Sequence, residues 1–220
     1  MESRLFGFLS FLNDSFHLCS AFVQLAIQLA MYRLVGKQCA TYEATQMRSY
    51  KHGRTETTRA VSLESASFVK HFGMNAKFND SISSIVEKRQ YLTNAVEAHV
   101  KYIGKAAKGA GVDRHLLGMS MLTGATEKVP DLYKDPLYIR AKTWRVSTSH
   151  LTHPRFENWG FGEVVPDGVG VAYGIKNESI IFNITARKCS HFTERMCHLL
   201  EEALLEMQLV HEAGSQRSKL

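Results

Sequence analysis

The strands and helices that this sequence predicts do not alternate regularly, and this order constrains the fold more than any other feature. Runs of β-branched and aromatic residues predict strands at residues 41–50, 143–149, 169–175 and 179–185. Apolar residues at helical spacing predict helices at residues 21–36, 62–72, 79–109 and 190–207. The mixture favours an α/β or α+β sandwich, in which helices pack on a mixed sheet.

Charge and cysteine content argue against nucleic-acid binding and against a metal site. The net charge is +6, but the basic residues are scattered and no zinc-finger, RNP or basic-zipper motif occurs. The cysteines are Cys19, Cys39, Cys189 and Cys197. Their spacing matches neither a zinc site nor a dense disulfide framework, so we expect reduced thiols and no metal.

The last three residues predict a peroxisomal location. Ser218, Lys219 and Leu220 form the carboxy-terminal address that the peroxisomal import receptor reads. The preceding residues, 212–216, are polar or small and would present this address on an exposed tail. We therefore expect residues 211–220 to be a tail and the protein to enter the peroxisomal matrix.

The first twenty residues are an atypical apolar start. Residues 5–12 are strongly apolar, but Asp14 would fall near the centre of any spanning helix, so a membrane span is not expected. A secretory signal would need a basic flank and a small-residue cleavage site, which are weak or missing here. We expect residues 1–20 to lie outside the domain, which would then cover residues 21–210.

Several short motifs occur in a characteristic order. They are Thr-Tyr-Glu-Ala at 41–44, the segment 53–59, Asp-Arg-His-Leu-Leu-Gly at 113–118, Ser-Thr-Ser at 147–149, and the segment 161–171. In this order and at these separations they resemble the carboxy-terminal half of the choline/carnitine acyltransferase family. The resemblance runs from about residue 21 to the carboxy terminus. It implies a chloramphenicol-acetyltransferase-like two-layer sandwich, an α/β fold that forms one half of a two-domain enzyme.

The resemblance implies a carnitine site. Enzymes of this family move an acyl group between coenzyme A and the carnitine hydroxyl, without a metal or a tightly bound cofactor. By resemblance, Tyr42, Thr55 and Arg114 hold the carnitine carboxylate, for which a guanidinium and hydroxyl donors are suited. Ser147 would line the pocket, and Phe161 would pack against the trimethylammonium. The alternatives are that Arg114 forms a structural ion pair, that Tyr42 and Thr55 are ordinary strand residues, and that Phe161 is a core residue. Keeping both Thr55 and Arg114 favours carnitine over choline, which has no carboxylate.

The resemblance also assigns a transition-state role and an acyl pocket. Ser149 would donate to the oxyanion that forms when the carnitine hydroxyl attacks the thioester. Leu151 and Trp159 would line the acyl pocket, and a bulky Trp159 favours a closed pocket and an acetyl group. If the match to the family were shifted by one residue, Gly160 rather than Trp159 would occupy this position and would open the pocket. A medium-chain acyl group therefore stays an alternative.

The family's proton acceptor, a histidine in a His-x-x-x-Asp-like motif, has no counterpart in this chain. His52, His153 and His198 have a glutamate four residues later, but none lies in a segment that resembles the motif. Because the proton acceptor is missing, we expect this chain alone to be inactive. Glu43 and His150 are the expected contacts with coenzyme A, the acyl-carrying co-substrate. The alternative is a non-catalytic binding or regulatory partner of a full-length carnitine acyltransferase.

Overall fold

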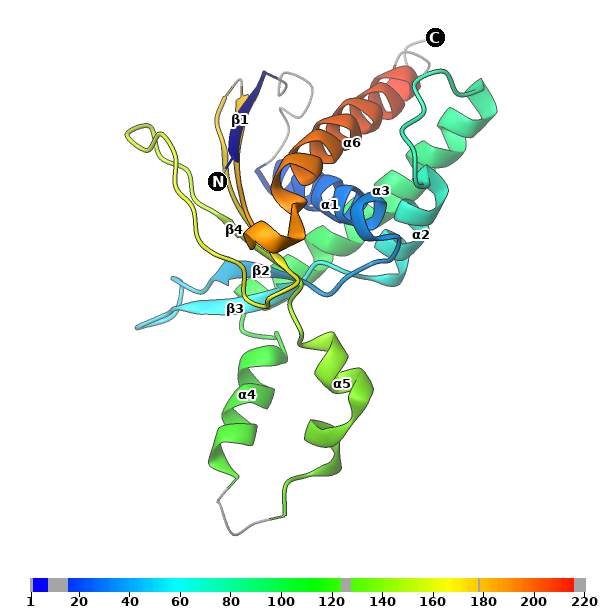
Figure 1. Ribbon diagram of the computed structural model, residues 1–220. Helices are drawn as coiled ribbons and strands as arrows, with labels where there is room; N and C mark the ends of the chain where they lie inside the picture. Colours follow the sequence, from blue (N-terminus) through cyan, green and yellow to red (C-terminus); the bar gives the residue numbers. More distant parts are fainter. Residues whose placement is uncertain (1, 8–15, 124–127, 178, 216–220) are drawn as a thin grey trace.

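A computed structural model describes residues 2–7, 16–123, 128–177 and 179–215 of the chain (Figure 1). The strands are β1 (Glu2–Gly7), β2 (Thr41–Gln46), β3 (Thr55–Arg59), β4 (Val146–His150), β5 (Val169–Ile175) and β6 (Ser179–Thr185). The helices are α1 (Phe16–Val35), α2 (Leu63–Phe72), α3 (Ile82–Ala107), α4 (Asp113–Leu122), α5 (Pro136–Ala141) and α6 (Phe192–Ser215). Two 3₁₀ turns are η1 (Asp131–Lys134) and η2 (Lys188–Ser190).

Within these residues the strands form one mixed sheet. Its six strands have the order β1-β6-β5-β4-β2-β3. β4 is parallel to both β2 and β5, and the remaining pairs are antiparallel. Helices α1, α3 and α6 lie together on one side of the sheet (Figure 1). The predicted α/β arrangement of a mixed sheet with packed helices is therefore confirmed.

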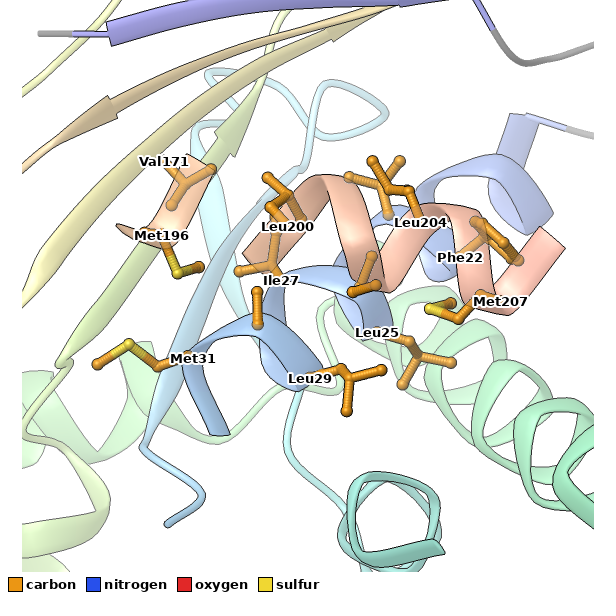
Figure 2. Close-up of a cluster of buried hydrophobic side chains, with 14 of the residues drawn as sticks. Phe22, Leu25, Ile27, Leu29, Met31, Val171, Met196, Leu200, Leu204 and Met207 are labelled. Atoms are coloured by element: carbon orange, nitrogen blue, oxygen red, sulfur yellow. The ribbon is translucent and has the colours of Figure 1, made fainter. Parts of the chain in front are cut away.

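The buried core joins α1 and α6 with the helix-facing side of the sheet. Figure 2 shows Leu200, Leu204 and Met207 of α6 in one buried cluster with Leu25, Ile27 and Leu29 of α1 and Val171 of β5. All are at most 1% exposed. Helix α1 is buried almost all round from Ser20 to Met31, which explains its dense apolar sequence. Each such aliphatic side chain contributes about 1.5–3 kcal/mol by its removal from water.

Several predicted elements keep their bounds and others shift. The strands at 169–175 and 179–185 occur as predicted, and α2 begins at the Ser62 capping box. The strand at 41–50 ends at Gln46, and the strand predicted at 143–149 occupies 146–150. The cap of α3 is Ser81 rather than Asn79 or Asp80, because the Asp80 carboxylate pairs with Lys88 instead.

The domain boundary predicted after residue 20 falls inside a helix. Helix α1 begins at Phe16, and the hydroxyl of Ser20 lies 3.2 Å from a carboxylate oxygen of Glu43 on β2. Glu2–Gly7 pairs antiparallel with β6 at the edge of the sheet. The described residues before 21 are thus joined to the sheet and the helix layer, which differs from the prediction. Helix α6 continues to Ser215, so the residues from 211 to 215 are helical rather than part of the predicted tail. Residues 8–15 and the address at 218–220 lie outside the described part of the chain.

Candidate functional site

Strand alternation separates the predicted site residues into two sets. Glu43 on β2 contacts α3, and Thr148 on β4 contacts α1, so these side chains face the helices. Successive residues of a strand point to opposite faces. Tyr42, Ser147 and Ser149 therefore lie on the face turned away from the helices. Tyr42 is in register with Ser147, so the two stand side by side on neighbouring strands.

Arg114 joins Tyr42 and Thr55 on this face. It is the second residue of α4, and its Nη2 donates to the Tyr42 hydroxyl at 3.0 Å. Its Nε donates to the backbone carbonyl of Thr55 at 3.3 Å. The guanidinium lies 5.9 Å from the Tyr42 ring centroid and is exposed. The fold thus brings together the three residues predicted to hold a carboxylate, although they lie up to 72 positions apart.

A loop covers the sheet next to the serines. The Thr185 hydroxyl donates to the Phe161 carbonyl, and the Asn183 amide donates to the Trp159 carbonyl at 2.9 Å. Gly170, the register partner of Ser147, makes this approach possible. A methyl group at Gly170 would lie 2.9 Å from the Phe161 carbonyl oxygen. Tyr42, Ser147, Gly170 and Thr185 are in register across four neighbouring strands. The loop therefore holds the backbone of Phe161 beside this row of residues.

Leu151 and Trp159 lie near each other beyond Ser149. Together with Gly174 and Ile181 they line a small recess of about 10 Å³. A space of this size holds about one water molecule. The Trp159 and Phe161 rings are 5.7 Å apart. Both predicted acyl-pocket residues thus line one nearly filled space.

Glu43 lies on the opposite face and is 2% exposed. One carboxylate oxygen lies 2.6 Å from His99 Nε2 of α3, and the other accepts from the Ser20 hydroxyl. The fold does not bring this carboxylate to the Tyr42 face. The expected contact between Glu43 and coenzyme A stays a prediction that this position does not favour.

His150 also faces the helices. Its ring stacks on Tyr173 at a centroid distance of 4.9 Å, and the backbone N–H of Ile175 donates to its Nε2. Burial lowers the pKa of His150 to about 4, although the nearby Glu43 carboxylate opposes this shift. The imidazole is therefore neutral at pH 7. Its predicted contact with coenzyme A stays a prediction.

A buried polar network that the sequence pattern does not predict supports the site. Gln24 Nε2 of α1 donates to the Thr148 hydroxyl at 2.8 Å and to the Tyr173 hydroxyl at 3.1 Å. The Thr148 hydroxyl then donates to the Tyr42 carbonyl at 2.9 Å. This bridge crosses the short parallel β2–β4 pairing where Tyr42 and Ser147 meet. A polar residue such as Gln24 within the apolar run of α1 was the available signal, but its partners are more than 100 residues away.

Two further features concern membranes and metals. Among the described residues, no helix is both long and apolar enough to cross a membrane. In the same part of the chain, no three or more His, Cys, Asp or Glu side chains are grouped as metal ligands.

Comparison with known proteins identifies the family. Residues 14–202 match the family described as choline/carnitine O-acyltransferase. The mitochondrial carnitine O-acetyltransferase of Saccharomyces cerevisiae is 38% identical over 91% of this chain and 30% of its own length. The human carnitine O-acetyltransferase is 38% identical over 91% of this chain and 31% of its own length. The mouse mitochondrial carnitine O-palmitoyltransferase 2 is 35% identical over 85% of this chain and 28% of its own length.

The chain thus spans about 30% of the length of these curated relatives. The match covers β2–β6, α4 and every predicted site residue. From its sequence, the chain belongs to the choline/carnitine O-acyltransferase family.

Proposed function

We propose that this chain carries the carnitine side of an acyl transfer between coenzyme A and carnitine. The observation that carries the proposal is the exposed Arg114 guanidinium, held against the Tyr42 hydroxyl and the Thr55 backbone beside Ser147. A fixed cation next to hydroxyl donors suits a carboxylate. The names of the relatives, which are carnitine acyltransferases, agree with this ligand.

In the proposed reaction the carnitine hydroxyl oxygen attacks the thioester carbonyl carbon. Ser149 donates to the oxyanion of the tetrahedral intermediate. The carbon–sulfur bond then breaks, the acyl group stays on the carnitine oxygen, and coenzyme A leaves as a thiolate. The hydroxyl proton passes to a general base, which then returns it to the departing thiolate. By resemblance this base is the histidine of the family's His-x-x-x-Asp-like motif, which has no counterpart among the histidines of this chain. Phe161 offers its ring face to the trimethylammonium group.

An acetyl group is the acyl group we propose. The bulky Trp159 side chain lies beside Leu151 in the same recess, which favours a short acyl group over a long hydrocarbon chain. The relatives include both an acetyltransferase and a palmitoyltransferase, so their names do not separate short from long chains. Coenzyme A is the proposed co-substrate.

Calorimetric titration of the purified 220-residue chain tests the proposal. We expect L-carnitine to bind and choline to bind about 10- to 100-fold more weakly, because choline leaves the Arg114 donors without a carboxylate. With acetyl-CoA added, we expect no acetylcarnitine. Equal affinity for the two ligands, or no heat from carnitine, would refute the proposed site. Turnover that is lost with Arg114→Ala would place a base inside this chain.

We further propose that the protein enters the peroxisomal matrix through Ser218, Lys219 and Leu220. A fluorescent protein fused ahead of residue 1 leaves the carboxy terminus free. We expect puncta that coincide with a peroxisomal marker and a diffuse signal after deletion of the last three residues. Puncta that survive the deletion, or a mitochondrial distribution, would contradict this location.

A further inference from the structure

Helices α4 and α5 project away from the sheet and from the helix layer (Figure 1). We call these two helices the arm. Neither helix contains a buried residue, and α4 has no side-chain hydrogen bond at its N-cap. Leu122 and Leu137 are 81% and 72% exposed. Yet α4 carries Arg114, the cation on which the proposed carnitine site depends. Since neither helix has a buried residue, apolar burial does not fix the orientation of the arm, and polar contacts must contribute.

We infer that Arg59 and Asp113 form a clamp that positions Arg114, a role that rests on the proposed carnitine function. Arg59 Nε and Nη2 donate to the two carboxylate oxygens of Asp113 at 3.0 and 2.7 Å. Arg59 Nη1 donates to the carbonyl of Ala141, the last residue of α5, at 2.8 Å. One side chain of β3 therefore holds the start of α4 and the end of α5.

The clamp is partly sheltered from water. The side chains of Arg59 and Asp113 are 24% and 11% exposed. The Arg59 guanidinium also lies 4.8 Å from the centroid of the Trp144 ring, which in turn contacts the Tyr42 ring edge-on at 5.6 Å. A two-pronged ion pair in such surroundings has a fixed geometry, unlike most surface pairs.

The clamp acts on the site through the adjacent residue. Asp113 precedes Arg114, whose backbone N–H donates to Glu56 Oε1 at 3.3 Å. Arg59 is the register partner of Tyr42, but each of its guanidinium nitrogens is already engaged. We therefore assign Arg59 a positioning role rather than direct contact with carnitine. Loss of the clamp would let α4 turn and carry the Arg114 guanidinium away from the Tyr42 hydroxyl.

A double-mutant cycle on carnitine affinity tests the clamp. We expect Arg59→Gln to weaken carnitine binding about tenfold in the wild-type background and less than twofold in an Arg114→Gln background. Arg59→Lys keeps one charge without the fork and should recover part of the affinity. Arg54→Gln, a matched change at an exposed arginine just before β3, should have no effect. Equal effects of Arg59→Gln in both backgrounds would overturn the positioning role.

Hydrogen exchange separates failure of the clamp from failure of the proposed function. We expect Arg59→Gln to speed exchange of the Arg114 and Leu116 amides of α4, while the amides of β5 stay protected. If the wild-type chain binds no carnitine, the proposed function fails. The exchange result alone then decides whether Arg59 and Asp113 hold α4 in place. Unchanged exchange in α4 would overturn the clamp.

Discussion

Replacing Glu206 with glutamine is expected to lower the free energy of unfolding by about 3–5 kcal/mol. Glu206 is fully buried on α6, and its two oxygens accept from Arg33 Nη2 of α1 at 2.5 Å and from Lys88 Nζ of α3 at 2.6 Å. The amide of glutamine would remove the negative charge and aim a donor at one of these cations. Chemical denaturation followed by circular dichroism measures the loss.

Glu202→Gln is the matched control for this prediction. Glu202 lies one turn earlier on the same helix. Among the described residues it contacts one basic side chain, the exposed His198, at 3.5 Å, and this contact is an ion pair only when His198 is protonated. We expect a change below about 0.5 kcal/mol. Equal losses in the two variants would mean that the buried network contributes no more than a surface charge. The helix layer would then depend on its apolar contacts alone.

Arg114→Gln is expected to weaken carnitine binding by about 10- to 100-fold, because hydrogen bonds to a charged group contribute roughly 1.5–3 kcal/mol. The side chain is exposed and its partners, the Tyr42 hydroxyl and the Thr55 carbonyl, stay hydrated without it. The fold should therefore be unaffected. Titration calorimetry measures the affinity, and thermal unfolding checks the fold.

Arg48→Gln removes the same charge from an exposed position near the end of β2 and should leave carnitine affinity unchanged. This control separates the specific contact of the Arg114 guanidinium with the carboxylate from the general attraction of the protein's positive charge. If Arg48→Gln weakened binding as much as Arg114→Gln, the carboxylate would be attracted by net charge alone. If neither variant changed the affinity, carnitine would bind away from the Tyr42 face.

The apolar pattern predicted the elements that carry the core. The strands at 169–175 and 179–185 kept their bounds because their inward residues belong to the apolar core that also contains residues of α1 and α6. Strand β3 and helices α4 and α5 were not assigned. β3 is a threonine-rich edge strand, and the arm has no buried face, so neither leaves an apolar periodicity in the sequence.

The site residues show what local pattern can and cannot predict. The resemblance predicts substrate contacts for both Tyr42 and Glu43, yet adjacent residues of a strand face opposite ways, and Glu43 contacts His99 on the helix-facing side. Alternation alone would have separated these two side chains. The clamp between Arg59 and Asp113 joins residues 54 positions apart, and only the folded arrangement reveals it.

Carnitine binding at the Tyr42 face is tested most directly by a two-dimensional amide NMR titration with L-carnitine. We predict saturable shifts at Tyr42, Arg114 and Ser147, with little change at Glu43 and in α6. These shifts should disappear in Arg114→Gln. Shifts confined to other elements, or none at millimolar carnitine, would contradict the account and leave a family member whose described site does not bind the family's substrate.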